Sequence, residues 1–489
     1  AMEDARKEID DIANSEEEPT FENTIEALEF SGRQLDRIAS LFFNLNSAET
    51  NDSIQKIAQE ISPLLSEFTN DIVLNENLFR KVQKVFEERE KYSLTEEQYT
   101  LLDKKYKNFS RNGANLNEEQ KKRLREIDST LATLKLKFGE NILKETNKYE
   151  MHLTNEHDLE GLPQSAKDAA EQLARNKGKQ GWLITLDYPS YIPFMKYARN
   201  RALRKKLSIA FGSRGFHNDE LDNQANVLKI ANLRYERARL LGYKSHADFI
   251  LEERMAETPE KVYDFLKELL LKAKPAAIQE FKELSEFAKK LDGIDLLQTW
   301  DGAYYSEKLK QKLFNLDDEK LKPYFKLENV IEGVFTITER LYGLSFEEVF
   351  DIDKYHPEVK TYRIYDRDKK FISLFYADFH PREGKRAGAW MTAFKPQYKL
   401  KNKNERPHIS NVCNFTRSTE KKPSLLTFNE VTTLFHEFGH ALHGILANTN
   451  YPSLSGTSVF WDFVELPSQI FENWCYEQEA LELFARHYE

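Results

Sequence analysis

Within Thr427–Gln469 the chain reads His436-Glu437-Phe438-Gly439-His440, and this run decides how the rest of the sequence is interpreted. On an α-helix, residues four apart lie on the same face, one turn from each other. The imidazoles of His436 and His440 can therefore reach a single metal ion. Glu437 is offset by about 100° around the helix axis. Its carboxylate would then lie beside the ion, in the position of a general base.

Two further features predict that this run is helical. Thr427 and Glu430 form a Thr-x-x-Glu capping box, which marks the start of a helix. Apolar residues then recur at intervals of three and four: Val431, Leu434, Phe438, Leu442 and Ile445. His443 lies on the opposite side, together with the two histidines of the motif. A helix with these two faces is suited to lie between a hydrophobic core and a cleft. The His-Glu-x-x-His motif itself is typical of metalloproteases, so it predicts this class of enzyme.

A catalytic zinc ion needs a third protein ligand and one open coordination position. Glu465 is the best candidate, because it lies in a second predicted helical stretch after a turn-rich loop at 451–458. Asp462 and Glu472 share the helical face of Glu465. We therefore expect these two carboxylates to hydrogen-bond the histidine ligands and to hold their tautomers.

The segments around this motif resemble the thimet oligopeptidase family of zinc peptidases, which includes bacterial peptidyl-dipeptidases and oligopeptidase A. The resemblance implies His436, His440 and Glu465 as ligands of one zinc ion per chain, and Glu437 as the base. It covers essentially the whole chain, and the segments that carry it are His436–His443, Ser455–Thr457, Asp462–Gln469, Asp378–Trp390, Pro19–Ile25 and Arg234–Tyr243. The amino-acid sequences of Met255–Pro259 and Trp300–Phe325 most resemble the bacterial peptidyl-dipeptidase and oligopeptidase A branch of the family.

Composition excludes several classes of protein. The net charge of −10 argues against a nucleic-acid-binding surface. The sequence contains no run of 18 apolar residues, so we expect no membrane span. Cys413 and Cys475 cannot form a disulfide framework, so we expect buried thiols and a cytoplasmic location. Because the chain begins with Ala1-Met2, its start looks trimmed, and an exported form stays open.

The hydrophobic patterns predict a mainly α fold with a small sheet directly before the metal-binding helix. We expect an N-terminal helical region at 1–190 and a metallopeptidase region at 191–489. The second region would contain helices at 191–353, then the sheet and the zinc-binding helices at 354–489. The resemblance implies a zincin-type fold with two helical lobes around a deep channel. The predicted strands are Tyr149–Thr154, Trp182–Leu186, Val359–Tyr365, Lys370–Asp378, Ala387–Phe394 and Ile409–Phe415.

The predicted activity is hydrolysis of short peptides by a zinc-bound water that Glu437 activates. Two modes stay open, dipeptidyl carboxypeptidase and oligoendopeptidase, and no substrate-binding residue is assigned. Glu489 ends the chain within a helical pattern, whereas members of the resembled family continue further. An alternative interpretation is an inactive, zinc-binding and peptide-binding fragment that needs a separate C-terminal segment or a second chain.

Overall fold

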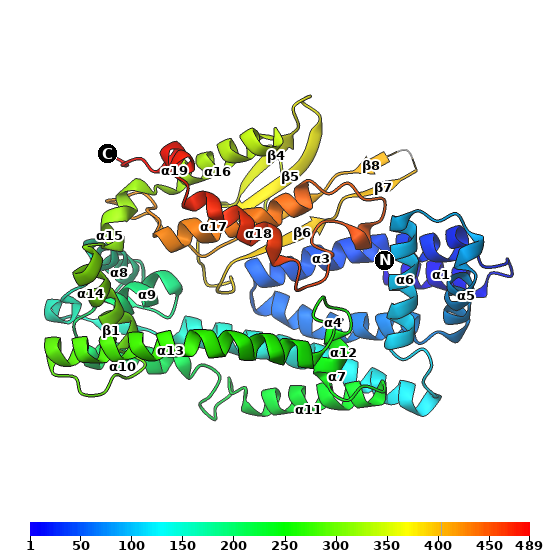
Figure 1. Ribbon diagram of the computed structural model, residues 1–489, viewed down its shortest axis with the longest axis horizontal. Helices are drawn as coiled ribbons and strands as arrows, with labels where there is room; N and C mark the ends of the chain where they lie inside the picture. Colours follow the sequence, from blue (N-terminus) through cyan, green and yellow to red (C-terminus); the bar gives the residue numbers. More distant parts are fainter. Residues whose placement is uncertain (402) are drawn as a thin grey trace.

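The computed structural model describes residues 1–401 and 403–489. The chain is mainly helical, with one five-stranded sheet and two two-stranded sheets (Figure 1). The predicted fold class, mainly α with a small sheet beside the candidate metal site, is confirmed. Over these residues, no helix combines the length and the apolar character that crossing a bilayer requires.

The first 148 residues form a group of packed helices. Asn51, Asn75, Thr95 and Asn117 each accept a hydrogen bond from a backbone N–H of the helix that follows, so these helices begin at side-chain caps. The helices at 2–14, 27–30, 52–73, 76–87 and 96–111 share one buried cluster, and the helix at 118–148 packs in a separate one. The helices are α1 (Met2–Asn14), α2 (Ala27–Phe30), α3 (Arg33–Ala48), α4 (Asp52–Val73), α5 (Glu76–Glu87), α6 (Glu96–Arg111) and α7 (Glu118–Lys148).

The next part of the chain contains a two-stranded antiparallel sheet of β1 (Met151–Leu153) and β2 (Trp182–Ile184). Both strands lie inside the predicted ones. They share a core with α8 to α10. In Figure 1 the long helices α4, α7, α11 and α13 run along one side of the molecule. The helices here are α8 (Gln164–Asn176), α9 (Tyr188–Tyr197), α10 (Arg201–Gly212), α11 (Gln224–Leu240), α12 (His246–Leu251), α13 (Pro259–Asp292), α14 (Gly302–Phe314), α15 (Asp318–Leu321) and α16 (Leu327–Tyr342).

The five-stranded sheet has the order β3-β4-β5-β9-β6. Its pairs are antiparallel except β5 with β9, which is parallel. Strand β6 lies at one edge and, among the described residues, pairs with β9 alone. Four strands of this sheet match predicted ones with shifted ends. Strand β3 was not predicted, and neither were β7 and β8, which form the second two-stranded sheet. The strands are β3 (Ser345–Val349), β4 (Lys360–Tyr365), β5 (Phe371–Asp378), β6 (Trp390–Lys395), β7 (Tyr398–Leu400), β8 (Lys403–Glu405) and β9 (His408–Val412).

Helix α17 (Phe428–Ile445) packs against this sheet, and α18 (Glu465–Glu472) and α19 (Gln478–Phe484) complete the C-terminal part. The largest buried cluster joins α16, the sheet, α17 and α19. Phe438 of α17 lies at its centre, with the ring of Phe375 from β5 at a centroid distance of 5.4 Å. The core of the sheet therefore anchors the helix that carries the histidine motif.

Candidate metal centre and active site

Helix α17 begins at the predicted capping box. The Thr427 hydroxyl accepts from the Glu430 backbone N–H at 3.2 Å, and the Glu430 carboxylate accepts from the Thr427 N–H at 2.8 Å. The same carboxylate also accepts from the Thr416 N–H at 2.6 Å. These bonds fix where the helix begins, and they tie it to the segment that leaves β9.

The two faces of α17 are as the pattern predicts. All five residues of the apolar stripe are buried. His436 and His440 lie on the other side, partly exposed, and their ring centroids are 4.9 Å apart. The helix therefore separates the hydrophobic core from a polar site.

The structure brings the three predicted ligands together. Oε2 of Glu465 lies 3.2 Å from Nε2 of His436 and 3.1 Å from Nε2 of His440. One ligand atom from each residue lies within 4.8 Å of the others. Over the described part of the chain, this is the one group of three or more His, Cys, Asp or Glu side chains with such spacing.

The close approach of α18 to α17 places Glu465 at this site. A Cβ atom at Gly439 would lie 2.6 Å from the Ser468 Cα and 2.8 Å from the Pro467 carbonyl oxygen, so only glycine permits this packing. The Ser468 hydroxyl in turn donates to the Glu465 carboxylate at 2.9 Å. Backbone contact between the two helices and one hydrogen bond therefore orient the Glu465 carboxylate, the predicted third ligand.

One of the two predicted carboxylate partners contacts a histidine. Nδ1 of His436 lies 2.7 Å from the Glu472 carboxylate. The prediction for Asp462 is wrong, because this residue lies before α18 begins and its carboxylate binds another segment. Its carboxylate accepts from the backbone N–H groups of Met255 and Ala256, at 3.0 and 2.9 Å. Asp462 therefore anchors the loop that precedes α13.

Glu437 is the most buried acidic group at the site, with 6% of its surface exposed. Burial raises the pKa of this carboxyl to about 7; nearby Glu465 adds to the rise, and His436 opposes it. Oε2 of Glu437 and Nδ1 of His440 are buried and have no hydrogen-bond partner among the residues that the structure describes. Two converging imidazoles, a carboxylate and an adjacent unpartnered carboxylate oxygen form a donor set that fits zinc and a reacting water.

His443 does not join the cluster. Burial lowers the pKa of its half-buried imidazole, so the ring is held neutral on the same helix. Both cysteines are buried and unbridged, and burial raises their pKa values.

A buried charge cluster behind the edge strand was not predicted. Asp378 pairs with Lys385 at 2.8 Å and with Arg382 at 2.6 Å, and it accepts from the Tyr355 hydroxyl at 2.7 Å. Burial lowers the pKa of Lys385 to about 8, against the opposing effect of Asp378. The only sequence signal for this cluster is the charge-rich segment Asp378–Trp390.

Hydrogen bonds from the end of α3 and from Asn414 hold the segment that leads into β6. The Thr50 N–H donates to the Gly384 carbonyl at 2.7 Å, and the Arg386 N–H donates to the Ser47 carbonyl at 3.0 Å, so the end of α3 holds the loop. The Asn414 side chain donates to the carbonyls of Arg386 and Gly388. These hydrogen bonds therefore hold residues 384–388 in place, directly before the edge strand β6.

Comparison with known proteins identifies the family to which this site belongs. The model of peptidase family M3 matches residues 194–489. The chain belongs to peptidase family M3. It is 38% identical over 490 residues to the dipeptidyl carboxypeptidase of Escherichia coli K12, covering 100% of this chain and 72% of that protein. It is 37% identical over 495 residues to E. coli oligopeptidase A, covering 100% of this chain and 73% of that protein.

Solved structures agree with the fold of an M3 peptidase. A structure of PZ peptidase A with an inhibitor aligns with a TM-score of 0.53 at 15% identity, over 99% of this chain and 68% of that one. A putative oligoendopeptidase F from Bacillus anthracis aligns equally well, over 99% of this chain and 71% of that one. At this identity the likeness concerns the fold alone. The predicted family and the predicted class of enzyme, a metallopeptidase, are both confirmed.

Proposed function

We propose that this M3 peptidase is zinc-dependent and hydrolyses peptide bonds in short peptides. His436, His440 and Glu465 would hold one zinc ion, and Glu437 would be the general base. The observation that carries the proposal is the convergence of the two Nε2 atoms and the Glu465 carboxylate within 4.8 Å, on a helix that also carries Glu437. When bound there, zinc would lower the pKa of a water molecule and polarise the scissile carbonyl.

Glu437 can carry the proton through the reaction. Burial raises the pKa of this carboxyl above its usual range, and a carboxylate in that position can take a proton from the attacking water and deliver it to the leaving amine. The carboxylate is fixed by burial on α17, next to the ligand His436. Proton transfer therefore needs no movement of the helix.

Two neighbouring side chains, Glu472 and Ser468, would hold His436 and Glu465 in the orientation that metal binding needs. Glu472 accepts the Nδ1 proton of His436, which leaves the lone pair of Nε2 directed at the site. The Ser468 hydroxyl holds one oxygen of Glu465. We expect both groups to affect metal affinity more than the proton transfer itself.

Two modes of cleavage remain in the proposal. One relative in E. coli is named a dipeptidyl carboxypeptidase and another an oligopeptidase. We infer that short peptides are the substrates and that a channel between helical lobes excludes folded proteins.

In both relatives the matched region is part of one longer chain, which lends no support to a separate chain that completes the site. We also propose the division into regions 1–190 and 191–489, since the family match begins at residue 194.

The test is hydrolysis of a quenched fluorescent oligopeptide, with the zinc content measured on the same sample. Stoichiometric zinc and cleavage that a chelator abolishes would support the proposal. Zinc without cleavage would favour the alternative of a peptide-binding fragment. A second peptide with an amidated C-terminus separates the modes, because an enzyme that reads the free carboxylate should fail to cut it.

A further inference from the structure

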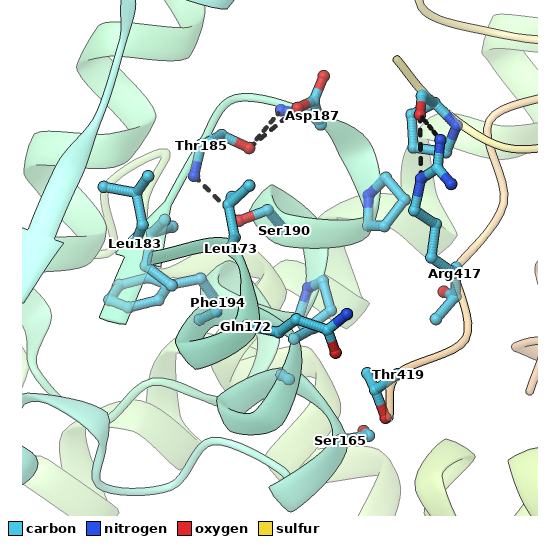
Figure 2. Close-up of a pocket in the computed structure, with 18 of the residues that line it drawn as sticks. Ser165, Gln172, Leu173, Leu183, Thr185, Asp187, Ser190, Phe194, Arg417 and Thr419 are labelled. Atoms are coloured by element: carbon cyan, nitrogen blue, oxygen red, sulfur yellow. Dashed lines mark hydrogen bonds between the residues drawn. The ribbon is translucent and has the colours of Figure 1, made fainter. Parts of the chain in front are cut away.

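A groove runs from the N-terminal turns of helix α17 along helix α9. Its first cavity, of about 500 Å³, lies between α9 and the N-terminal turns of α17. Its second cavity, of about 390 Å³, lies between α8, β2, α9 and the segment 416–419. Figure 2 shows this second cavity, with Leu173 and Phe194 on one side and Arg417 and Thr419 opposite. The two cavities share lining residues, among them Pro193 and Thr416, and together we call them the α9 groove.

The groove begins at the catalytic helix and at the edge strand. Thr433, which lines the first cavity, precedes His436 by three residues and lies on the same helical face. Gly388 and Ala389, which also line it, immediately precede β6. A peptide held at the metal centre and along β6 would therefore enter this groove.

The direction of such a peptide follows from the sheet. Among the residues described, β6 pairs with no strand other than β9, and helix α3 lies against it, so an extended peptide would pair with the outer edge of β6 beside α3. Antiparallel pairing is the more stable arrangement. An antiparallel peptide would run from the Lys395 end of β6 to its Trp390 end, so residues on the carboxyl side of the scissile bond would approach Gly388 and the groove.

We propose that the α9 groove binds the carboxyl-side part of the peptide through its apolar side chains, and does not recognise a terminal carboxylate. This inference rests on the proposed peptidase function. The residues that give the groove its apolar character include Tyr188, Ile192, Phe194, Leu173, Leu183 and Phe415. Large aliphatic and aromatic side chains of a substrate are the groups that such a lining favours.

The charges of the groove argue against a carboxylate site. Every lysine and arginine that lines it, among the residues described, already pairs with a carboxylate. The pairs are Lys177–Glu150 at 2.6 Å, Lys196–Asp318 at 2.6 Å, Lys322–Glu319 at 2.6 Å, Arg382–Asp378 at 2.6 Å and Arg417–Glu358 at 2.5 Å. Asp187, Glu383 and Glu430 line the groove as well. Among the described residues that line the groove, a terminal carboxylate would meet only cations that already have an acidic partner, and it would meet further acidic groups.

The first measurement compares two fluorescent peptides that differ only in a free or an amidated C-terminus. Binding is followed by anisotropy on zinc-loaded Glu437→Gln protein, so that nothing is cleaved and the zinc content is known. We expect the two dissociation constants to agree within about threefold, or the amide to bind more tightly. Binding of the free acid that is about tenfold tighter, or no binding of either peptide, overturns the inference.

The second measurement fills the groove. Ile192, 41% exposed on α9, lines the first cavity, whereas Ile209, 50% exposed on α10, lines neither cavity. Ile192→Trp should weaken binding of a peptide rich in Phe and Leu by about tenfold, and the matched Ile209→Trp should leave it unchanged. Equal affinity in the two variants, with unchanged circular dichroism, overturns the inference.

Cleavage by the wild-type chain separates this inference from the proposed function. Zinc-dependent cleavage with no effect of Ile192→Trp would reject the groove and keep the peptidase. Absence of zinc binding and of cleavage would reject the peptidase, and the same anisotropy measurements on metal-free protein would still decide whether the groove binds peptides. Where cleavage occurs, mass spectrometry of a peptide library should show Phe and Leu preferred over Asp directly after the scissile bond.

Discussion

Helices α17 and α13 both carry apolar residues at helical spacing, but α17 is largely buried and α13 is largely exposed to solvent. Ten of the 18 residues of α17 are buried, whereas Ala288 alone is buried among the 34 residues of α13. Apolar side chains of α13 face solvent instead, with Leu271 at 69% and Phe265 at 63% exposure. Figure 1 shows α17 against the sheet and α18, and α13 along the opposite side of the molecule.

This difference shows what positions a catalytic group. In α17 each site residue is flanked by buried side chains of its own turn, as His436 and Glu437 are by Phe435 and Phe438. Packing therefore fixes their rotation about the helix axis. No comparable anchor exists on α13, so a site on that helix would lack the required precision.

The largest expected effect tests whether the chemistry is confined to α17. Glu437→Gln removes the base but keeps the hydrogen-bonding shape, so kcat/KM should fall by about 10³-fold while the zinc content stays constant. The control is Glu280→Gln on α13, an exposed position that should retain full activity. Activity of Glu437→Gln near that of the wild type would contradict the assignment of the base.

The difference in burial predicts a difference in stability. Phe438→Ala should lower the free energy of unfolding by about 3–5 kcal/mol, because it removes a ring that packs on Phe375 and Phe346. Phe265→Ala on α13 should change it by less than about 0.5 kcal/mol. Denaturant unfolding of both variants checks this, and equal losses would show that the exposed helix is as well anchored as the buried one.

A smaller effect concerns the group that orients a ligand. Glu472→Gln weakens the acceptor for the Nδ1 proton of His436, so zinc affinity should fall by about 10- to 100-fold. Competition with a chelator measures this affinity. Asp462→Asn is the matched control, since that carboxylate binds the loop before α13 and not a histidine. Equal affinities in the two variants would rule out an orienting role for Glu472.

The smallest predicted effect concerns pH and the sheet under α17. Burial, assisted by Lys395 and Arg37, lowers the pKa of His408 from 6.5 to about 4. The unfolded chain therefore takes up a proton before the folded chain does as the pH falls. Stability should be complete above pH 6.5 and should decrease by about 1–2 kcal/mol towards pH 4, since the ring is only partly buried.

His408→Gln should remove this part of the pH dependence. Unfolding of both proteins at pH 7 and pH 4.5 measures it. The same slope in the variant would assign the pH dependence to other groups.

Regular patterns predicted much of the fold. The strands β4, β5 and β9 alternate or run apolar, and each was placed within a few residues. Strand β3 was missed because Glu347 and Glu348 interrupt its apolar character at the edge of the sheet. The prediction for Asp462 assumed that this residue belongs to the same helix as Glu465. Helix α18 begins only at Glu465, so the helical spacing does not apply, and the Asp462 carboxylate binds the Met255 backbone instead.

The sequence by itself determined the local part of the site. A capping box and an i, i+4 pair act within one helix, where geometry follows directly from spacing, so His436, Glu437 and His440 could be placed without any tertiary contact. The tertiary structure alone decided what meets that helix. The contact of Gly439 with α18, the buried charges behind β6, and the α9 groove all join segments that are distant in the chain, and no local periodicity encodes such contacts.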